Sequence, residues 1–120
     1  MINHDRLAET FKALAQTSSP SRREGVLAAD LRLRLAALGA ESWVDESAAA
    51  TGSDTGNLLA RLEGSVSVPP IVLCAHMDTV GPAENIRVRF ADGVFTSDGT
   101  TILGADDKSS IAVLLEALQV

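Results

Sequence analysis

The chain has 120 residues, 46% of them hydrophobic, and a formal net charge of −6 at pH 7. This length fits one domain or part of a larger one, and the apolar content excludes a disordered tail. The acidic balance argues against a nucleic-acid-binding protein, which normally carries a basic patch. We therefore expect an acidic cytoplasmic protein with no nucleic-acid partner.

Two further classes of protein find no support in the sequence. No stretch reaches the roughly 18–20 apolar residues of a membrane span, so no membrane partner is expected. Cys74 is the only cysteine, so no internal disulfide can form and secretion gains no support.

The N-terminal part of the chain predicts two helices. Asn3 is a candidate N-cap for a helix over residues 4–16. Ser21 and Glu24 have capping-box spacing, and a second helix follows them up to Gly39. The apolar stripes that we expect in the core are Leu7, Phe11 and Leu14 in the first helix and Leu27, Leu31, Leu35 and Leu38 in the second.

Short strands and loops are expected beyond Gly39. Residues 41–46 and 57–64 read as strands, and the small residues at 48–56 between them read as a loop. The lone tryptophan, Trp43, is expected in the core.

The run "IVLCAH" (71–76) is continuously apolar up to its histidine, which predicts a central strand buried on both faces. Cys74 would then be a buried, small apolar residue. Asp92-Gly93 within residues 86–97 predicts a hairpin.

A final helix is expected from about residue 107, with Ile111, Leu114, Leu115 and Leu118 on one face. This order of elements predicts the α/β class, with a mixed sheet flanked by helices.

His76 lies at the end of the predicted central strand, where α/β sheets place ligand sites. Asp78 follows two residues later, so both side chains point to the same side of an extended segment. A carboxylate there can accept the second N–H of a metal-bound imidazole and fix its tautomer. A structural salt bridge or a turn explains the same pair. We place His4 on the surface.

Asp106 and Asp107 precede the final helix. Helix capping is the simpler interpretation, but it explains only one aspartate and leaves Asp98-Gly99 and Gly104 without a reason. A carboxylate can also bridge two metal ions, as sites with two metals require.

Two blocks, "CAHMDTVGP" (74–82) and "VFTSDGTTILGADDKSSIAVLLEAL" (94–118), resemble metallopeptidase family M20, most closely its peptidase T branch. The resemblance covers nearly the whole chain and departs from the usual pattern at Ser109-Ser110, where the family usually has a glycine.

The resemblance implies roles for individual residues. His76 matches a histidine that binds zinc, Asp78 matches the catalytic aspartate that orients it, and Asp106 matches the carboxylate that bridges two zinc ions. The peptide bond after Asp106 would be cis. Asp98, Asp107 and Lys108 are left as possible outer residues of the site, without firm roles.

The family also uses a general-base glutamate, further ligands and a lid domain. No histidine follows His76, and after Asp106 only Asp107 and Glu116 are acidic. We therefore expect residues 1–120 to be the N-terminal part of the catalytic domain, truncated before the lid domain. Such a part should bind metal weakly, be inactive alone, and pair with another copy as a homodimer or by strand swapping through an open apolar face.

The resemblance implies a di-zinc aminopeptidase that acts on short peptides, in the manner of a tripeptidase, when the protein is complete. Two alternatives stay open. One is an M20 amidohydrolase or deacylase that acts on N-acyl or carbamoyl amino acids, and the other is an inactive piece that only folds and self-associates.

Overall fold

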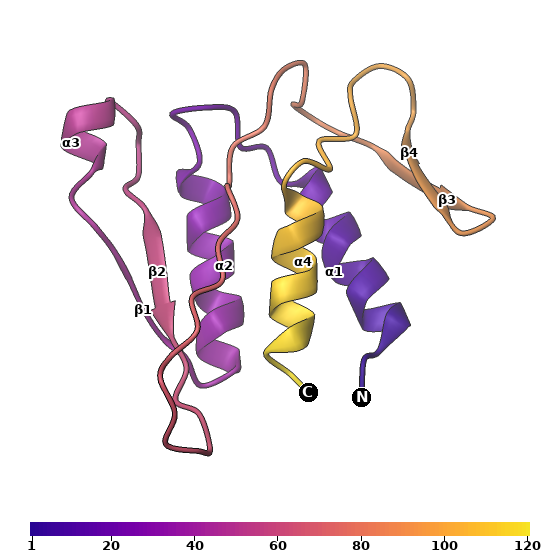
Figure 1. Cartoon of the computed structure of the whole chain (residues 1–120). Coiled ribbons are helices and arrows are strands. Elements are labelled where there is room, and N and C mark those ends of the chain that lie inside the picture. The colour runs from indigo at the N-terminus through magenta and orange to yellow at the C-terminus, as the bar shows by residue number, and fades with distance from the viewer.

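The computed structural model describes residues 1–120, which form helices and two small sheets (Figure 1). None of the helices is both long and apolar enough to cross a membrane. The helices are α1 (His4–Gln16), α2 (Gly25–Ala37), α3 (Ala48–Thr51) and α4 (Lys108–Ala117). The strands are β1 (Glu41–Val44), β2 (Leu58–Arg61), β3 (Val88–Ala91) and β4 (Val94–Ser97).

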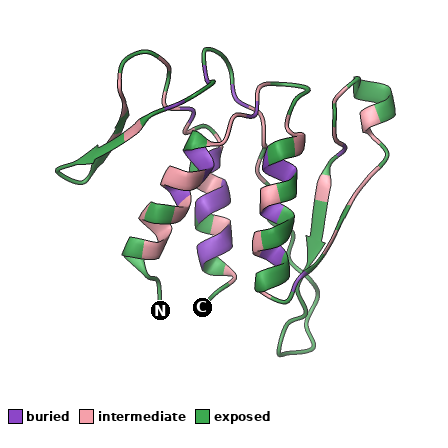
Figure 2. Ribbon diagram, turned by 180° about the vertical axis from the view of Figure 1, so that it is seen from behind, coloured by how far each residue is buried: buried purple, intermediate pink, exposed green.

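The core lies between α1, α2 and α4. The inward faces of these helices carry most of the buried residues (Figure 2). The apolar stripes predicted from the sequence form this core or pack against it, except for Leu114, and Leu14 and Leu27 are completely buried. Phe95 of β4 packs edge to face against Phe11 of α1, with ring centroids 4.8 Å apart. This contact packs strand β4 against α1.

The helix ends confirm two predictions and correct one. The Asn3 side chain accepts a hydrogen bond from the Arg6 N–H at 3.0 Å, so Asn3 caps α1. Gly39 has a φ of +81° just beyond α2, as expected of a C-terminal glycine. The capping box is wrong: Glu24 occupies the N-cap of α2 without a side-chain bond, and the Ser21 hydroxyl donates to Asp78 instead.

The α/β class is confirmed, but the strands form two separate antiparallel pairs. β1 pairs with β2, and β3 pairs with β4. Asp92 and Gly93, with φ of 51° and 77°, turn between β3 and β4, which confirms the predicted hairpin. The expected mixed sheet is not formed within these residues, and the predicted loop at 48–56 contains the short helix α3.

The predicted central strand at 71–76 is the main correction. These residues are in no strand and have no sheet partner. Ile71 and Val72 are 83% and 90% exposed, and Cys74 is exposed rather than buried. Trp43, expected in the core, is also exposed at 44%. The sequence suits a buried strand, but the residues present offer no neighbouring strand to pair with it.

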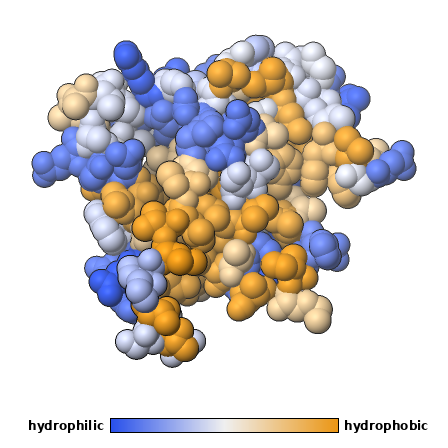
Figure 3. All heavy atoms as spheres, in the orientation of Figure 1, coloured by the Kyte–Doolittle hydropathy of each residue, from blue (hydrophilic) through white to orange (hydrophobic).

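A broad apolar surface results. Figure 3 shows apolar residues gathered over the middle and lower part of one face. The expectation of an open apolar face is therefore confirmed, while self-association through it stays a prediction. The exposed apolar side chains between β2 and the site include Val66, Val68, Ile71, Val72 and Leu73.

A bidentate ion pair joins α1 to α4. Arg6 donates from Nε and Nη2 to the two carboxylate oxygens of Glu116, each at 2.7 Å, and the Asn3 N–H donates to Glu116 Oε1 at 2.7 Å. The Glu116 side chain is only 3% exposed. The hydrogen bonds from Arg6 and Asn3 hold the pKa of Glu116 below its usual value.

We predict that this pair makes the fold sensitive to acid. Because folding lowers the pKa of Glu116, its stabilising effect is present above the ordinary pKa of 4.5 and is lost as the pH falls through the folded-state value. Glu116→Gln should lower the free energy of unfolding at neutral pH and flatten its decline below pH 4.5, measured by denaturant titration. Glu63→Gln, at an exposed pair with Arg61, is the control. Parallel pH profiles for wild type and Glu116→Gln would contradict this account.

Candidate functional site

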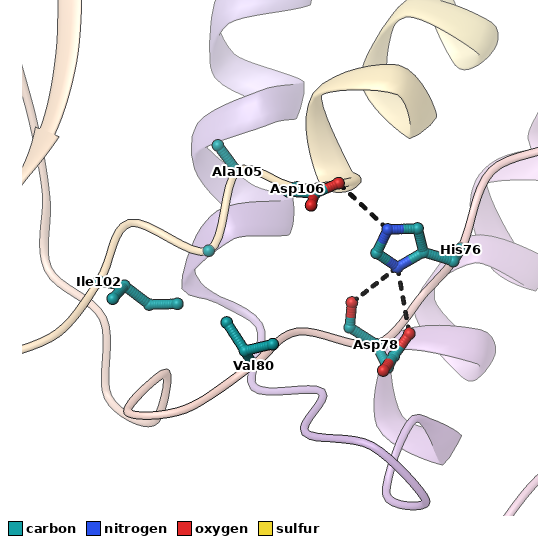
Figure 4. Close-up of a pocket in the computed structure, with 7 residues that line it drawn as sticks. His76, Asp78, Val80, Ile102, Ala105 and Asp106 are labelled. Atoms are coloured by element: carbon teal, nitrogen blue, oxygen red, sulfur yellow. Dashed lines mark hydrogen bonds and ion pairs between the residues drawn. The ribbon is translucent and has the colours of Figure 1, made fainter.

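The structure brings His76 together with Asp78 and Asp106 (Figure 4). His76 Nε2 lies 3.1 Å from Asp106 Oδ1, although 30 residues separate them in the chain. On the other side of the ring, Nδ1 lies 3.1 Å from Asp78 Oδ1 and 2.9 Å from the Asp78 carbonyl oxygen. The imidazole is thus held between two carboxylates, one at each nitrogen.

The loop after α1 holds the His76 segment in place. The Thr79 N–H donates to the Ser19 carbonyl at 2.9 Å, and the Ser19 hydroxyl donates to the Met77 carbonyl at 2.8 Å. Pro20 and Thr79 form an isolated parallel bridge. Ser19 is completely buried, so these hydrogen bonds attach residues 77–79 to the interior of the protein.

The simpler interpretation of Asp106 and Asp107 as helix caps is not supported. Asp107 is at the N-cap of α4 but makes no side-chain capping bond, and the Asp106 carboxylate contacts His76. The Asp106–Asp107 peptide bond is cis, as the family resemblance implied. The Asp106 side chain is 94% exposed, so its second oxygen is open to solvent or to a ligand.

Lys108 anchors the start of α4. It is completely buried, and its ammonium donates to the Thr17 carbonyl at the C-terminal end of α1. Burial lowers its pKa to about 8. Lys108 therefore fixes the backbone next to Asp106 rather than facing a ligand.

Asp98 makes its contacts with Thr100 and Arg87. Its Oδ1 accepts bonds from the Thr100 N–H at 2.9 Å and from the Thr100 hydroxyl at 2.5 Å, and Arg87 lies 4.0 Å away. These bonds lower the pKa of Asp98. The structure thus assigns Asp98 to the turn after β4.

Burial and the neighbouring carboxylates act in opposite directions on the pKa of His76. Burial favours the neutral ring, but the hydrogen bonds with Asp106 and Asp78 outweigh it and raise the pKa of His76. The pKa of Asp78 is lowered, first by the Ser21 hydroxyl and then by His76. Asp78 is therefore held as a carboxylate able to accept the Nδ1 proton.

A hollow of about 130 Å³ opens beside these groups. It is polar at the His76 and Asp106 end and apolar opposite, as Figure 4 shows. Its lining residues are His76, Asp78, Val80, Ile102, Gly104, Ala105 and Asp106.

The pair His76 and Asp106 fits two ligands of one metal ion. Imidazole nitrogen and carboxylate oxygen are ordinary zinc ligands, and a tetrahedral zinc ion holds neighbouring ligand atoms roughly 3.3 Å apart. The observed 3.1 Å is close to this separation. No group of three or more His, Cys, Asp or Glu side chains in the chain is arranged to hold a metal ion. His76 and Asp106 are therefore two side chains of zinc-ligand chemistry at a separation that one ion could span.

The sequence pattern gave no indication of the role of Ser19 and Ser21. Both lie in a short polar break between helices, nearly 60 residues before the segment that they contact. Only tertiary structure brings them to the site, and the spacing of Ser21 and Glu24 predicts a helix cap instead.

Comparisons with known proteins find peptidases among the proteins similar to this chain. No protein-family profile matches the chain. Over all of its length it is 37% identical to the uncharacterised protein YqjE of Bacillus subtilis (strain 168), covering 32% of that protein. It is 31% identical to peptidase T of Vibrio parahaemolyticus, in a match that covers 57% of this chain and 25% of that one.

Two solved structures match nearly the whole fold. A tripeptidase of Staphylococcus aureus (Mu50) superposes with a TM-score of 0.94 at 42% identity, over 99% of this chain. Aminopeptidase PepT of Bacillus cereus (ATCC 10987) superposes with a TM-score of 0.95 at 39% identity, over 98% of this chain. The chain spans 32% of the length of each.

We predict that replacing Gly104, beside the site, destabilises the fold more than replacing a glycine in open space. Gly104 has a φ of +68°, and an added Cβ would lie 3.1 Å from Ile86 Cδ1 and 3.5 Å from Thr79 Cγ2. Gly99→Ala, with a φ of +92° and open space around it, should cost about 1–2 kcal/mol of unfolding free energy from backbone strain alone. Gly104→Ala should cost about 1 kcal/mol more, because of crowding. Equal losses in the two variants would show that the contact with Ile86 and Thr79 is unimportant.

Proposed function

Because the chain belongs to the peptidase T branch of metallopeptidase family M20, we propose that it supplies metal-binding residues of a zinc-dependent aminopeptidase that hydrolyses short peptides. The observation that carries this proposal is the placing of His76 Nε2 3.1 Å from the Asp106 carboxylate, with Asp78 at the opposite ring nitrogen. This is the order of groups in a carboxylate–histidine–metal arrangement.

Each residue has a distinct task in the proposed site. His76 Nε2 is the ligand, and Asp78 accepts the Nδ1 proton, which keeps the Nε2 lone pair free for the metal. Asp106 has one oxygen toward His76 and one exposed, which suits a carboxylate shared by two ions. Zinc, when bound, supplies Lewis acidity that polarises the peptide carbonyl and lowers the pKa of a water.

The rest of the machinery would come from beyond this chain. Catalytic zinc sites use three protein ligands, and the structure supplies two candidates for one ion. The chain spans 32% of the length of the tripeptidase and of the aminopeptidase PepT. We propose that the remaining ligands and the general base lie in the part of the protein that corresponds to the other two-thirds of these relatives.

The proposed substrates are short peptides. Among the similar proteins, those with a named activity are a tripeptidase, an aminopeptidase and a peptidase T. These names favour peptides over N-acyl or carbamoyl amino acids. The apolar end of the hollow, with Val80 and Ile102, would suit the side chain of a substrate residue.

A chimaera tests the proposal. The 120 residues would replace the matching part of the Bacillus cereus aminopeptidase PepT, to which they are 39% identical. We predict that the chimaera hydrolyses a tripeptide. In this chimaera, His76→Ala or Asp106→Ala should lower kcat/KM by more than about 100-fold. Removing a metal ligand should reduce activity more than removing a residue that only orients a ligand, which typically costs about 10–100-fold.

His4→Ala is the matched control, because His4 is the only other histidine and is exposed on α1. It should leave kcat/KM unchanged. A folded chimaera without activity, or one whose activity survives His76→Ala, would contradict the proposed function.

A further inference from the structure

We infer that Ser21 is a positioning residue of this site, which holds the Asp78 carboxylate in the orientation that fixes the His76 imidazole. The inference rests on the proposed function and adds a residue from a different part of the chain. Ser21 lies in the loop between α1 and α2, 57 residues before Asp78.

The two Asp78 oxygens have separate partners. Oδ2 accepts the hydrogen bond from the Ser21 hydroxyl, and Oδ1 lies 3.1 Å from His76 Nδ1. The hydrogen bond to Oδ2 restrains rotation of the carboxylate and thereby favours the position of Oδ1 next to the ring. A chain of contacts therefore runs from Ser21 through Asp78 to the ring nitrogen opposite Asp106.

His76 Nδ1 has a second acceptor within reach, which makes the orientation of Asp78 important. The Asp78 carbonyl oxygen lies 2.9 Å from Nδ1, slightly nearer than the carboxylate oxygen. If the carboxylate turned away, Nδ1 would keep only the neutral carbonyl. A charged acceptor makes the stronger hydrogen bond and raises the basicity of the imidazole toward a metal.

The Ser21 hydroxyl is not forced into this contact by burial or by helix capping. Ser21 is exposed, so water could satisfy its hydroxyl. The N-cap of α2 is Glu24, without a side-chain bond, so Ser21 does not close the capping box that its spacing suggests. Its contact with Asp78 therefore has no role in beginning the helix.

The backbone around Ser21 is well placed to hold it still. Ser19 is paired with Met77 and Thr79 through the hydrogen bonds of its hydroxyl and carbonyl. Arg22 has a φ of 70°, and its N–H donates to Glu24 Oε1 at 2.8 Å. Ser21 thus sits between two tethered residues and presents its hydroxyl to Asp78 at a fixed place.

The test uses nitrogen NMR of the His76 ring in the 120-residue chain, at a pH where the ring is neutral. In the metal-free chain, Ser21→Ala should lower the fraction of the Nδ1–H tautomer, and Ser21→Thr, which keeps the hydroxyl, should restore it. Titration with zinc should show a dissociation constant raised about 10-fold by Ser21→Ala, at the low end for the loss of an outer hydrogen-bond partner.

A double-mutant cycle separates this role from a structural one. In an Asp78→Ala background, Ser21→Ala should have no further effect on zinc binding, because Ser21 acts through Asp78. Ser18→Ala, in the same loop, is the matched control and should change neither readout. Amide spectra and thermal unfolding would establish that each variant is folded.

Two results would overturn the inference. One is an unchanged tautomer fraction in folded Ser21→Ala, and the other is an equal loss of zinc affinity with and without Asp78. If the wild-type chain bound no zinc, the zinc part of the proposed function would fail, while the tautomer comparison would still decide the role of Ser21.

Discussion

The buried contact between the Lys108 ammonium and the Thr17 carbonyl joins the start of α4 to the end of α1. A cation is favoured there, because the C-terminal end of a helix carries partial negative charge. Two residues further along the same loop, Ser19 pairs with the backbone of residues 77–79. One short loop thus holds both segments of the site, which places His76 beside Asp106.

The same arrangement leaves much of the molecule open. The helices bury their apolar stripes against one another, but the extended segment before His76 has no neighbour on its exposed side. Its exposed side chains are apolar and its backbone groups are unpaired, so the segment is available for pairing with another strand. The matched relatives are about three times as long, since the chain covers 32% of each.

The sequence was most informative where local physics decides the structure. The Asn3 cap, the Gly39 terminus, the Asp92-Gly93 turn and the helical stripes each depend on neighbouring residues, and each is confirmed. The prediction failed for residues 71–76, because a strand needs partners that the sequence of the strand cannot specify. Trp43 and Cys74, both expected to be buried, are exposed.

The same contrast between local contacts and contacts over long sequence distances applies to the site. His76 and Asp78 are two residues apart, and their contact follows from the geometry of an extended chain. The approach of Asp106, 30 residues away, was suggested only by resemblance to a family. Ser21 was assigned to a helix cap, because residues 57 apart leave no local signal of contact.

The proposed function requires that His76 and Asp106 share one metal ion. The most direct test is anomalous diffraction at the zinc edge from crystals of the chain soaked in zinc. The account predicts an ion within about 2.0–2.2 Å of both His76 Nε2 and an Asp106 oxygen. Zinc bound elsewhere, such as at the Asp98 turn, with none between His76 and Asp106, would contradict it.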